Sequence, residues 1–186
     1  RLTDHIGAIQ QKTADQLAQI HLANGEGIPT LTEILELVDG SAPLLIEIKD
    51  QDGTNGANIG KLEAATAAAL ANYRGAVAVM SFNPHAIAEM ARLAPDIPRG
   101  LVTCNFTQED WPFTPAERRE YLTRIPDYAP LGCCFISHDR EDLTNHAVTL
   151  LRAAGAPILC WTVRSPTQEK AARKIAHNIT FEGYLA

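Results

Sequence analysis

The chain has 186 residues, of which 46% are hydrophobic, and a formal net charge of -6 with a pI near 5.5. This length suits one domain with one core, which we expect to span residues 1–186. The acidic balance argues against a nucleic-acid-binding protein, because phosphate contacts need clustered Lys and Arg. No apolar stretch is long enough to span a bilayer and no signal peptide opens the sequence, so neither is predicted.

Short β-rich runs alternate with amphipathic helical stretches, a pattern typical of βα units around a parallel sheet. Helices are indicated by Asn83-Pro84 and by the Ala-rich stretch 59–73. Helix starts are also indicated by three capping pairs, Thr30 with Glu33, Thr114 with Glu117, and Ser165 with Gln168. Six strands are predicted: Leu44–Lys49, Ala76–Phe82, Arg99–Thr103, Gly132–Ser137, Pro157–Val163 and Asn178–Glu182.

The first predicted strand contains an acid and a base in an otherwise apolar run. Glu47 and Lys49 share one face of the strand, because successive side chains alternate. Ionised groups in a buried sheet are costly unless they are paired, metal-bound or hydrated, so this pair indicates a functional site. A plain salt bridge at the strand end is the alternative. Asp50 and Asp52 precede Gly53 and are interpreted as turn formers, with metal binding as the alternative.

The four cysteines are Cys104, Cys133, Cys134 and Cys160, and none of them forms a CxxC motif. They are predicted to be reduced thiols in the core, which favours a cytoplasmic protein.

Two architectures fit the alternation of strands and helices, a TIM (β/α)8 barrel and an open doubly wound sheet. Neither GxGxxG nor GxxxxGK[ST] occurs, which argues against a dinucleotide-binding open sheet. Polar residues gather instead at the ends of several strands, as in a barrel whose site lies at one rim. They are Glu47, Lys49, Ser81, Thr103, Ser137, Thr162, Arg164 and Glu182. Six strands do not close an eight-stranded barrel, so exposed edges are expected.

Several segments together resemble the bacterial glycerophosphodiester phosphodiesterase family. They are Arg1-Leu2-Thr3, Gly27-Ile28-Pro29-Thr30-Leu31 with Glu33-Ile34-Leu35, Leu45-Ile46-Glu47-Ile48-Lys49, Met80-Ser81-Phe82-Asn83-Pro84, Trp161-Thr162-Val163 and Thr180-Phe181-Glu182-Gly183. Each motif is weak alone, but their common order is specific. The resemblance covers nearly the whole chain and implies a phosphodiesterase-type TIM barrel that is incomplete, with about six βα units.

The resemblance also implies a reaction, the metal-assisted hydrolysis of a glycerophosphodiester to glycerol 3-phosphate and an alcohol. Glu47 would bind a divalent cation, Mg²⁺ or Ca²⁺, and Lys49 would be a catalytic group that neutralises the phosphate. Trp161 would form a wall beside the glycerol, with core packing as the alternative. Three further residues are predicted to bind substrate. They are Ser81 and Phe82 at the pocket wall, and Glu182, which would contact the substrate or orient Lys49. Core packing is the alternative for Phe82, and a solvated carboxylate at the strand end is the alternative for Glu182.

The family's catalytic histidines and two further metal carboxylates belong to its first two strands, and no segment here matches them. Arg1 aligns just beyond those motifs, so we expect a missing N-terminal segment of the same polypeptide, weak metal binding and an inactive isolated chain. His138-Asp139 follows a later strand and is interpreted as a rim or loop pair. Two alternatives stay open: a non-catalytic phosphodiester-binding module, and a homo-oligomer that associates through its open edges.

Overall fold

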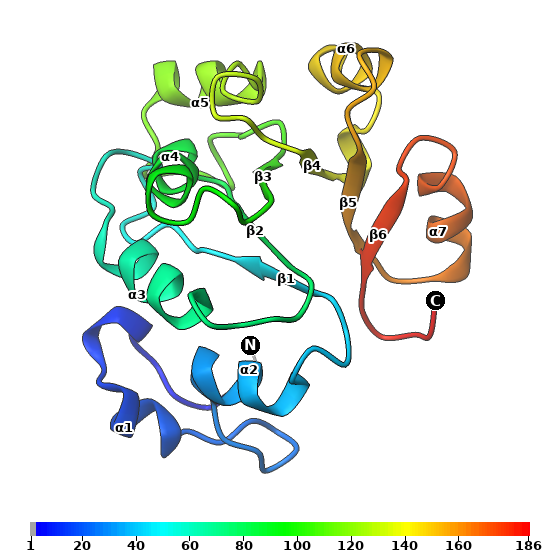
Figure 1. The fold of residues 1–186 in the computed structure, drawn as a ribbon. Coiled ribbons are helices and arrows are strands. Elements are labelled where there is room, and N and C mark those ends of the chain that lie inside the picture. The colour runs from blue at the N-terminus through cyan, green and yellow to red at the C-terminus, as the bar shows by residue number, and fades with distance from the viewer. Residues whose placement is uncertain (1–2) are drawn as a thin grey trace.

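Six parallel strands form one sheet whose spatial order follows the chain, from β1 to β6 (Figure 1). The computed structural model describes residues 3–186, so Arg1 and Leu2 of the predicted first motif lie outside the described residues. The strands are β1 (Leu44–Glu47), β2 (Val77–Ser81), β3 (Arg99–Thr103), β4 (Phe135–Asp139), β5 (Ile158–Val163) and β6 (Asn178–Phe181). The sheet curls into half a barrel, with β1 and β6 as its edges.

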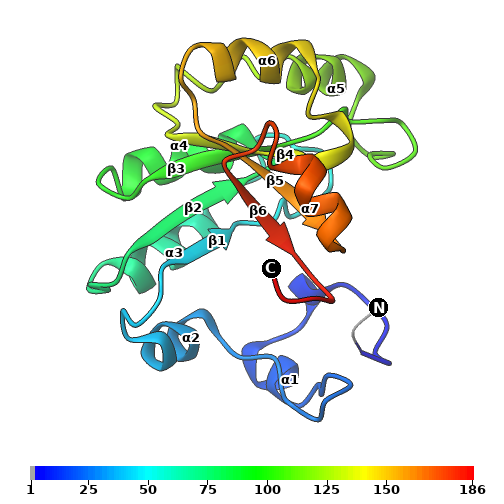
Figure 2. The same ribbon diagram turned by 90° about the vertical axis from the view of Figure 1, so that its right-hand side faces the viewer.

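Helices cover the outside of this half-barrel (Figure 2). They are α1 (Ala14–Ala18), α2 (Leu31–Val38), α3 (Lys61–Leu70), α4 (Pro84–Leu93), α5 (Ala116–Thr123), α6 (His146–Ala153) and α7 (Pro166–Ala172), with 3-10 turns η1 (Ile9–Gln11) and η2 (Arg140–Asp142). Within residues 3–186, none of these helices has the length and hydropathy needed to cross a membrane.

The sheet has two apolar faces because side chains alternate along each strand. On the outer face, Val79, Ile136 and Ile158 are fully buried beneath the helices. On the inner face, Met80 and Phe135 pack with other apolar residues of the barrel interior. The predicted TIM-type architecture of about six βα units is therefore confirmed.

Most strand ends differ by one or two residues from the prediction, and β4 differs most. Residues 132–134 precede β4, because Gly132 has a φ of 60° and the Cys133 amide still donates to Tyr128. The strand instead continues through His138 and Asp139. The interpretation of this pair as a rim or loop feature is therefore wrong for His138, which is 0% exposed within the strand.

The capping predictions have three different outcomes. The Thr30–Glu33 box is complete. Ser165 caps α7 by accepting from the Gln168 amide. The Thr114 box is wrong, because α5 begins at Ala116 with Pro115 as its N-cap, and the Thr114 hydroxyl makes tertiary contacts instead.

All four cysteines are free, as predicted, but they are not all in the core. Cys104, Cys133 and Cys160 are buried, whereas Cys134 is exposed.

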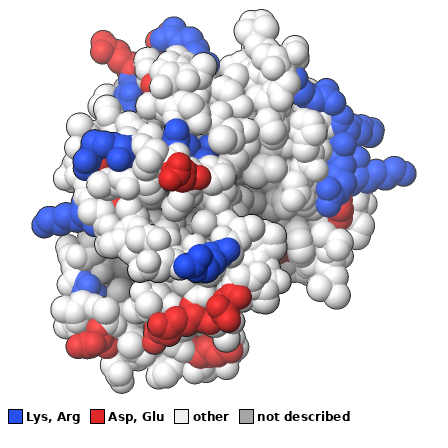
Figure 3. Space-filling model, in the orientation of Figure 1, with Lys and Arg blue, Asp and Glu red and all other residues white. Residues whose placement is uncertain are grey.

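Charge is unevenly distributed over the surface (Figure 3). Acidic side chains gather over α2, which carries exposed Glu33 and Glu36. Basic side chains gather over α7 and the residues that follow it, including exposed Lys170, Arg173 and Lys174. Although the net charge of the chain is -6, its surface therefore has a positive region at α7, next to the last strand β6.

Candidate functional site

The acid and base predicted from the first strand form an ion pair at the carboxyl end of β1. Lys49 Nζ lies 2.7 Å from Glu47 Oε1, and the lysine side chain is 71% exposed against 22% for the glutamate. The Glu47 Oε1 atom is itself shielded from solvent and accepts no hydrogen bond of regular geometry. The pair thus combines a reachable cation with a shielded carboxylate oxygen that faces this cation.

Carboxylates near this pair are already used within the protein. Asp50 accepts from the Asn83 side chain at 2.7 Å, and Asp52 accepts from both the amide and the hydroxyl of Thr54. These contacts confirm Asp52 as a turn former and make Asp50 a link between two loops. In residues 3–186, no group of three or more His, Cys, Asp or Glu side chains is placed to hold a metal ion.

Aromatic rings stand at the same rim on two other strands, since Phe82 directly follows β2 and Trp161 lies in β5. The Phe82 ring lies 5.6 Å from the Trp161 ring, nearly perpendicular to it, and both side chains are partly exposed. The Trp161 indole N–H donates to the Ser137 carbonyl at 3.1 Å, which fixes the orientation of the ring. The structure therefore brings Phe82 and Trp161 into contact with each other.

Two aromatic residues that sequence reasoning did not select complete this group. Trp111 lies 4.8 Å from Phe82 and 5.1 Å from Phe106, measured between ring centroids. Both belong to the loop between β3 and α5, which has no regular periodicity. A signal was present in the aromatic residues 106, 111 and 113 after a strand, but only the fold shows that this loop reaches Phe82.

Ser81 occupies a different position from the one predicted. It is 0% exposed, its hydroxyl donates to the Ile48 carbonyl at 2.6 Å, and it accepts from the Asn83 amide. Alternation along β2 directs Ser81 away from the inner face that holds Met80 and Phe82. Ser81 therefore ties two strand ends together rather than lining the pocket, and we do not carry it forward as a substrate ligand.

Glu182 follows the last strand and accepts from Arg164 Nε at 2.7 Å. Both side chains are partly exposed, so water screens this pair. This contact brings the ends of β5 and β6 together. The orientation of Lys49 comes from Glu47 in this arrangement.

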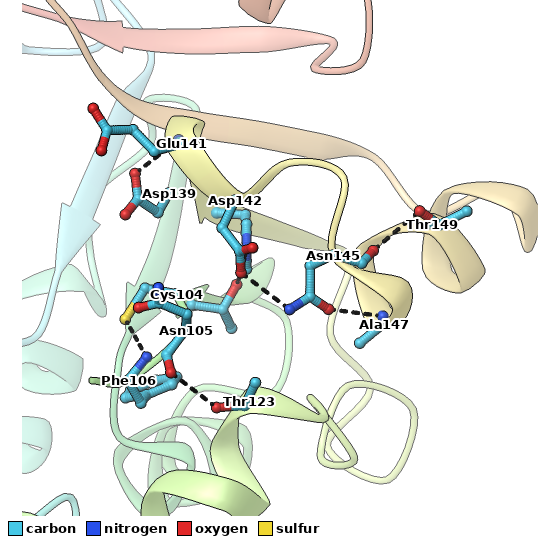
Figure 4. A network of polar contacts seen from close by, with 12 residues as sticks. Cys104, Asn105, Phe106, Thr123, Asp139, Glu141, Asp142, Asn145, Ala147 and Thr149 are labelled. Atoms are coloured by element: carbon cyan, nitrogen blue, oxygen red, sulfur yellow. Dashed lines mark hydrogen bonds and ion pairs between the residues drawn. The ribbon is translucent and has the colours of Figure 1, made fainter. Parts of the chain in front are cut away.

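A buried polar network lies behind the rim, on the helix-facing side of β3 and β4 (Figure 4). His138 Nδ1 lies 2.7 Å from the Thr103 hydroxyl, and its Nε2 lies 3.3 Å from Asp142. Asp142 also accepts from Asn145, whose side chain caps α6. Burial lowers the pKa of His138 despite the opposing effect of Asp142. The network locks the loop after β4 and keeps His138 away from the inner face.

The sequence matches the glycerophosphoryl diester phosphodiesterase family over residues 1–180. A comparison with curated protein sequences found no match. Several solved structures share the fold at low identity.

One is a phosphodiesterase of Oleispira antarctica in complex with the product sn-glycerol-3-phosphate, with 22% identity and a TM-score of 0.72 over 97% of this chain and 71% of that one. A glycerophosphodiester phosphodiesterase of Parabacteroides distasonis has 23% identity and a TM-score of 0.67 over 95% of this chain and 71% of that one. The enzyme of Thermotoga maritima has 18% identity and a TM-score of 0.65 over 97% and 70% respectively.

Proposed function

Because the chain belongs to the glycerophosphoryl diester phosphodiesterase family, we propose that its rim serves the hydrolysis of a glycerophosphodiester to glycerol 3-phosphate and an alcohol. The observation that carries the proposal is the Glu47–Lys49 pair at the carboxyl end of β1. Active sites of barrel enzymes are built at this end of the strands. An exposed ammonium there suits a phosphate anion, which it binds by charge-assisted hydrogen bonds.

We assign the other rim residues by what their side chains offer. Lys49 neutralises the phosphate, and the partly exposed rings of Phe82 and Trp161 form the apolar wall of the pocket. Glu182 is held at the end of β6 by Arg164, where its carboxylate is a hydrogen-bond acceptor for substrate hydroxyl groups.

The family generally depends on a divalent cation. We propose Glu47 as one ligand, since its carboxylate lies at the carboxyl end of β1; a metal ion there would replace the Lys49 ammonium that now lies 2.7 Å from Oε1. Mg²⁺ and Ca²⁺ take about six oxygen ligands. The described residues do not supply such a set, so we assign the metal no step and expect it to bind this chain weakly.

Phosphate recognition is tested by calorimetric titration of the folded chain with glycerol 3-phosphate. Lys49→Ala should weaken binding about tenfold or more, because the loss of a hydrogen bond to a charged group costs roughly 1.5 to 3 kcal/mol. Lys170→Ala, which removes an exposed lysine on α7, is the matched control and should leave the affinity unchanged. Equal affinity of Lys49→Ala and the unsubstituted chain would remove the basis of the proposal.

Turnover is measured as release of glycerol 3-phosphate from glycerophosphocholine in Mg²⁺, Ca²⁺ or EDTA. The described carboxylates do not complete a metal site, so we expect the 186-residue chain alone to stay near background. If metal-dependent turnover occurs, Glu47→Ala should abolish it. Turnover that survives this substitution contradicts the role of Glu47. Binding without turnover under every condition is the outcome that a phosphodiester-binding module would give.

A further inference from the structure

The backbone around Lys49 is held on both sides, although the lysine side chain itself is exposed. Lys49 lies two residues beyond β1, where the backbone pairing with β2 has ended. Side chains from the end of β2 make the connections there. The Ser81 hydroxyl donates to the Ile48 carbonyl at 2.6 Å, and the Asn83 side chain donates to Asp50 Oδ1 at 2.7 Å. Lys49 therefore has a fixed backbone beneath an exposed side chain.

Asn83 is fully buried and uses all the polar atoms of its side chain. Besides Asp50, its amide nitrogen donates to the Gly56 carbonyl at 2.8 Å. Its oxygen accepts from the His85 amide at 3.0 Å and thereby caps α4. A buried amide whose donors and acceptor are all engaged has one defined orientation. Asn83 thus fixes Asp50 relative to the first turn of α4.

Asp50 is satisfied by neutral groups. Its second carboxylate oxygen accepts from the Asn55 amide at 3.3 Å, so both donors are uncharged amides. Neighbours in the chain can form an ion pair in this protein, as Arg140 and Glu141 do. Asp50 is the neighbour of Lys49, yet its oxygens are directed to amides instead.

Loss of the Asn83 amide would change the charge balance at Lys49. Asp50 would lose its closest donor, and the cation next to it in the chain is Lys49. Lys49 already faces one carboxylate, that of Glu47. A second carboxylate beside the ammonium would compete with an incoming phosphate for the same positive charge.

We propose that Asn83 is a positioning residue for Lys49. By binding Asp50, it keeps this carboxylate away from the lysine, so that the ammonium stays available to a phosphate. Because Asn83 is 0% exposed, it acts on the ligand only through these neighbours. The inference rests on the proposed function and identifies a buried residue that determines the affinity of that site.

The test is a titration of the folded chain with glycerol 3-phosphate, followed by calorimetry. Asn83→Ser keeps a residue that caps helices well but removes the amide donors. It should weaken binding about threefold to fivefold, the range expected for one added exposed ion pair. Asp50→Asn removes the competing charge and keeps an acceptor for Asn83. In the Asp50→Asn background, Asn83→Ser should therefore change the affinity by less than about twofold.

Asn145→Ser is the matched control, because Asn145 makes the same kind of contacts at α6. Its side chain donates to Asp142 at 3.0 Å and accepts from the Ala147 amide at 2.8 Å. This variant should lose a similar amount of stability in urea unfolding and bind glycerol 3-phosphate as the unsubstituted chain does. An equal effect of Asn83→Ser with and without the Asp50 charge would show a structural role only and overturn the inference.

A second measurement separates this inference from the proposed function. If the unsubstituted chain does not bind glycerol 3-phosphate, the proposed function fails, and the surroundings of Lys49 are measured without ligand. The ¹³C-methyl resonance of reductively methylated Lys49, assigned with Lys49→Arg, should shift in Asn83→Ser. It should return when Asp50→Asn is added. An unchanged resonance in Asn83→Ser overturns the inference whether or not the ligand binds.

Discussion

His138 shows how one residue obtains a defined chemical state from its surroundings. Asp142 only accepts hydrogen bonds, so the histidine Nε2–H donates to it and Nδ1 accepts from the Thr103 hydroxyl. This assignment describes a neutral imidazole with both nitrogens satisfied. Because the side chain is fully buried, the charged form is disfavoured, and burial lowers its pKa.

This burial predicts a pH dependence of stability. The unfolded chain binds a proton at His138 near the ordinary histidine pKa of about 6.5, whereas the folded chain does so only at lower pH. Stability from this residue is therefore complete above that pH and decreases as the pH falls below it. His138→Gln should cost about 1 to 3 kcal/mol at pH 7. Its deficit should shrink at pH 5, as measured by urea unfolding of both proteins.

The exposed His146 on α6 provides the comparison. His146→Gln should unfold at nearly the same urea concentration as the unsubstituted chain at both pH values. If the deficit of His138→Gln is the same at pH 5 and pH 7, the neutral state of His138 is not what stabilises the fold.

At the scale of elements, the loop after β1 is bound to the start of α5. The Thr114 hydroxyl donates to the Gly53 carbonyl at 2.8 Å and accepts from the Asn55 side chain. Arg118 Nε donates to the Asn55 carbonyl at 3.0 Å. Asn55 is fully buried with a φ of 52°, a conformation that Asn tolerates better than most residues. These bonds hold the loop that follows Glu47 and Lys49 against the loop that carries Trp111.

Loss of this connection should destabilise the fold measurably. Thr114→Val removes the hydroxyl at similar volume and leaves the Gly53 carbonyl without its donor, so we expect a loss of about 1 to 3 kcal/mol in urea unfolding. Thr114→Ser should restore most of it. Thr149→Val on α6 is the control, since the exposed Thr149 hydroxyl bonds only its own helix and should change stability by less than about 0.5 kcal/mol. Equal losses at both threonines would contradict the proposed lock.

The bounds of strands and helices could be predicted from the sequence where neighbouring residues determine them. The predicted strand Arg99–Thr103 has the observed bounds of β3, and Thr30 opened α2 as expected. The prediction from sequence was wrong where contacts with residues far away in the chain determine the structure. Thr114 capped no helix because Gly53 and Asn55 engaged it, and β4 extended to His138 because Thr103 met its ring. Trp111 was not predicted at the site, because no pattern in the sequence indicates that the loop between β3 and α5 brings it to Phe82.

At the scale of the whole molecule, the two outer strands leave unpaired edges. No strand within residues 3–186 pairs with the outer side of β1 or β6. Leu45 and Phe181 on these edge strands are 41% and 43% exposed. Unpaired edges with apolar side chains favour association with another chain.

We therefore expect concentration-dependent association of the isolated chain, measured by sedimentation equilibrium. Leu45→Lys should reduce the fraction of oligomer several-fold, because an edge lysine opposes strand pairing. Leu150→Lys changes an exposed leucine on α6 away from both edges and should leave association unchanged. A single monomeric mass across micromolar to millimolar concentration would exclude the edges as an interface.

The order of the sheet also determines how this molecule loses its structure. Each strand pairs with its neighbours in the chain, as Leu44 does with Val77 and Ile136 with Ile158. A βα unit at either end can therefore detach without breaking the remaining strand pairs, much as a terminal repeat leaves a solenoid. Partial unfolding then proceeds inward from β1 and β6, and β3 and β4 open last. The Glu47–Lys49 pair lies at the β1 end of the sheet, whereas the aromatic residues at the rim come from three places: Phe82 directly after β2, Trp161 in β5 and Trp111 in the loop after β3.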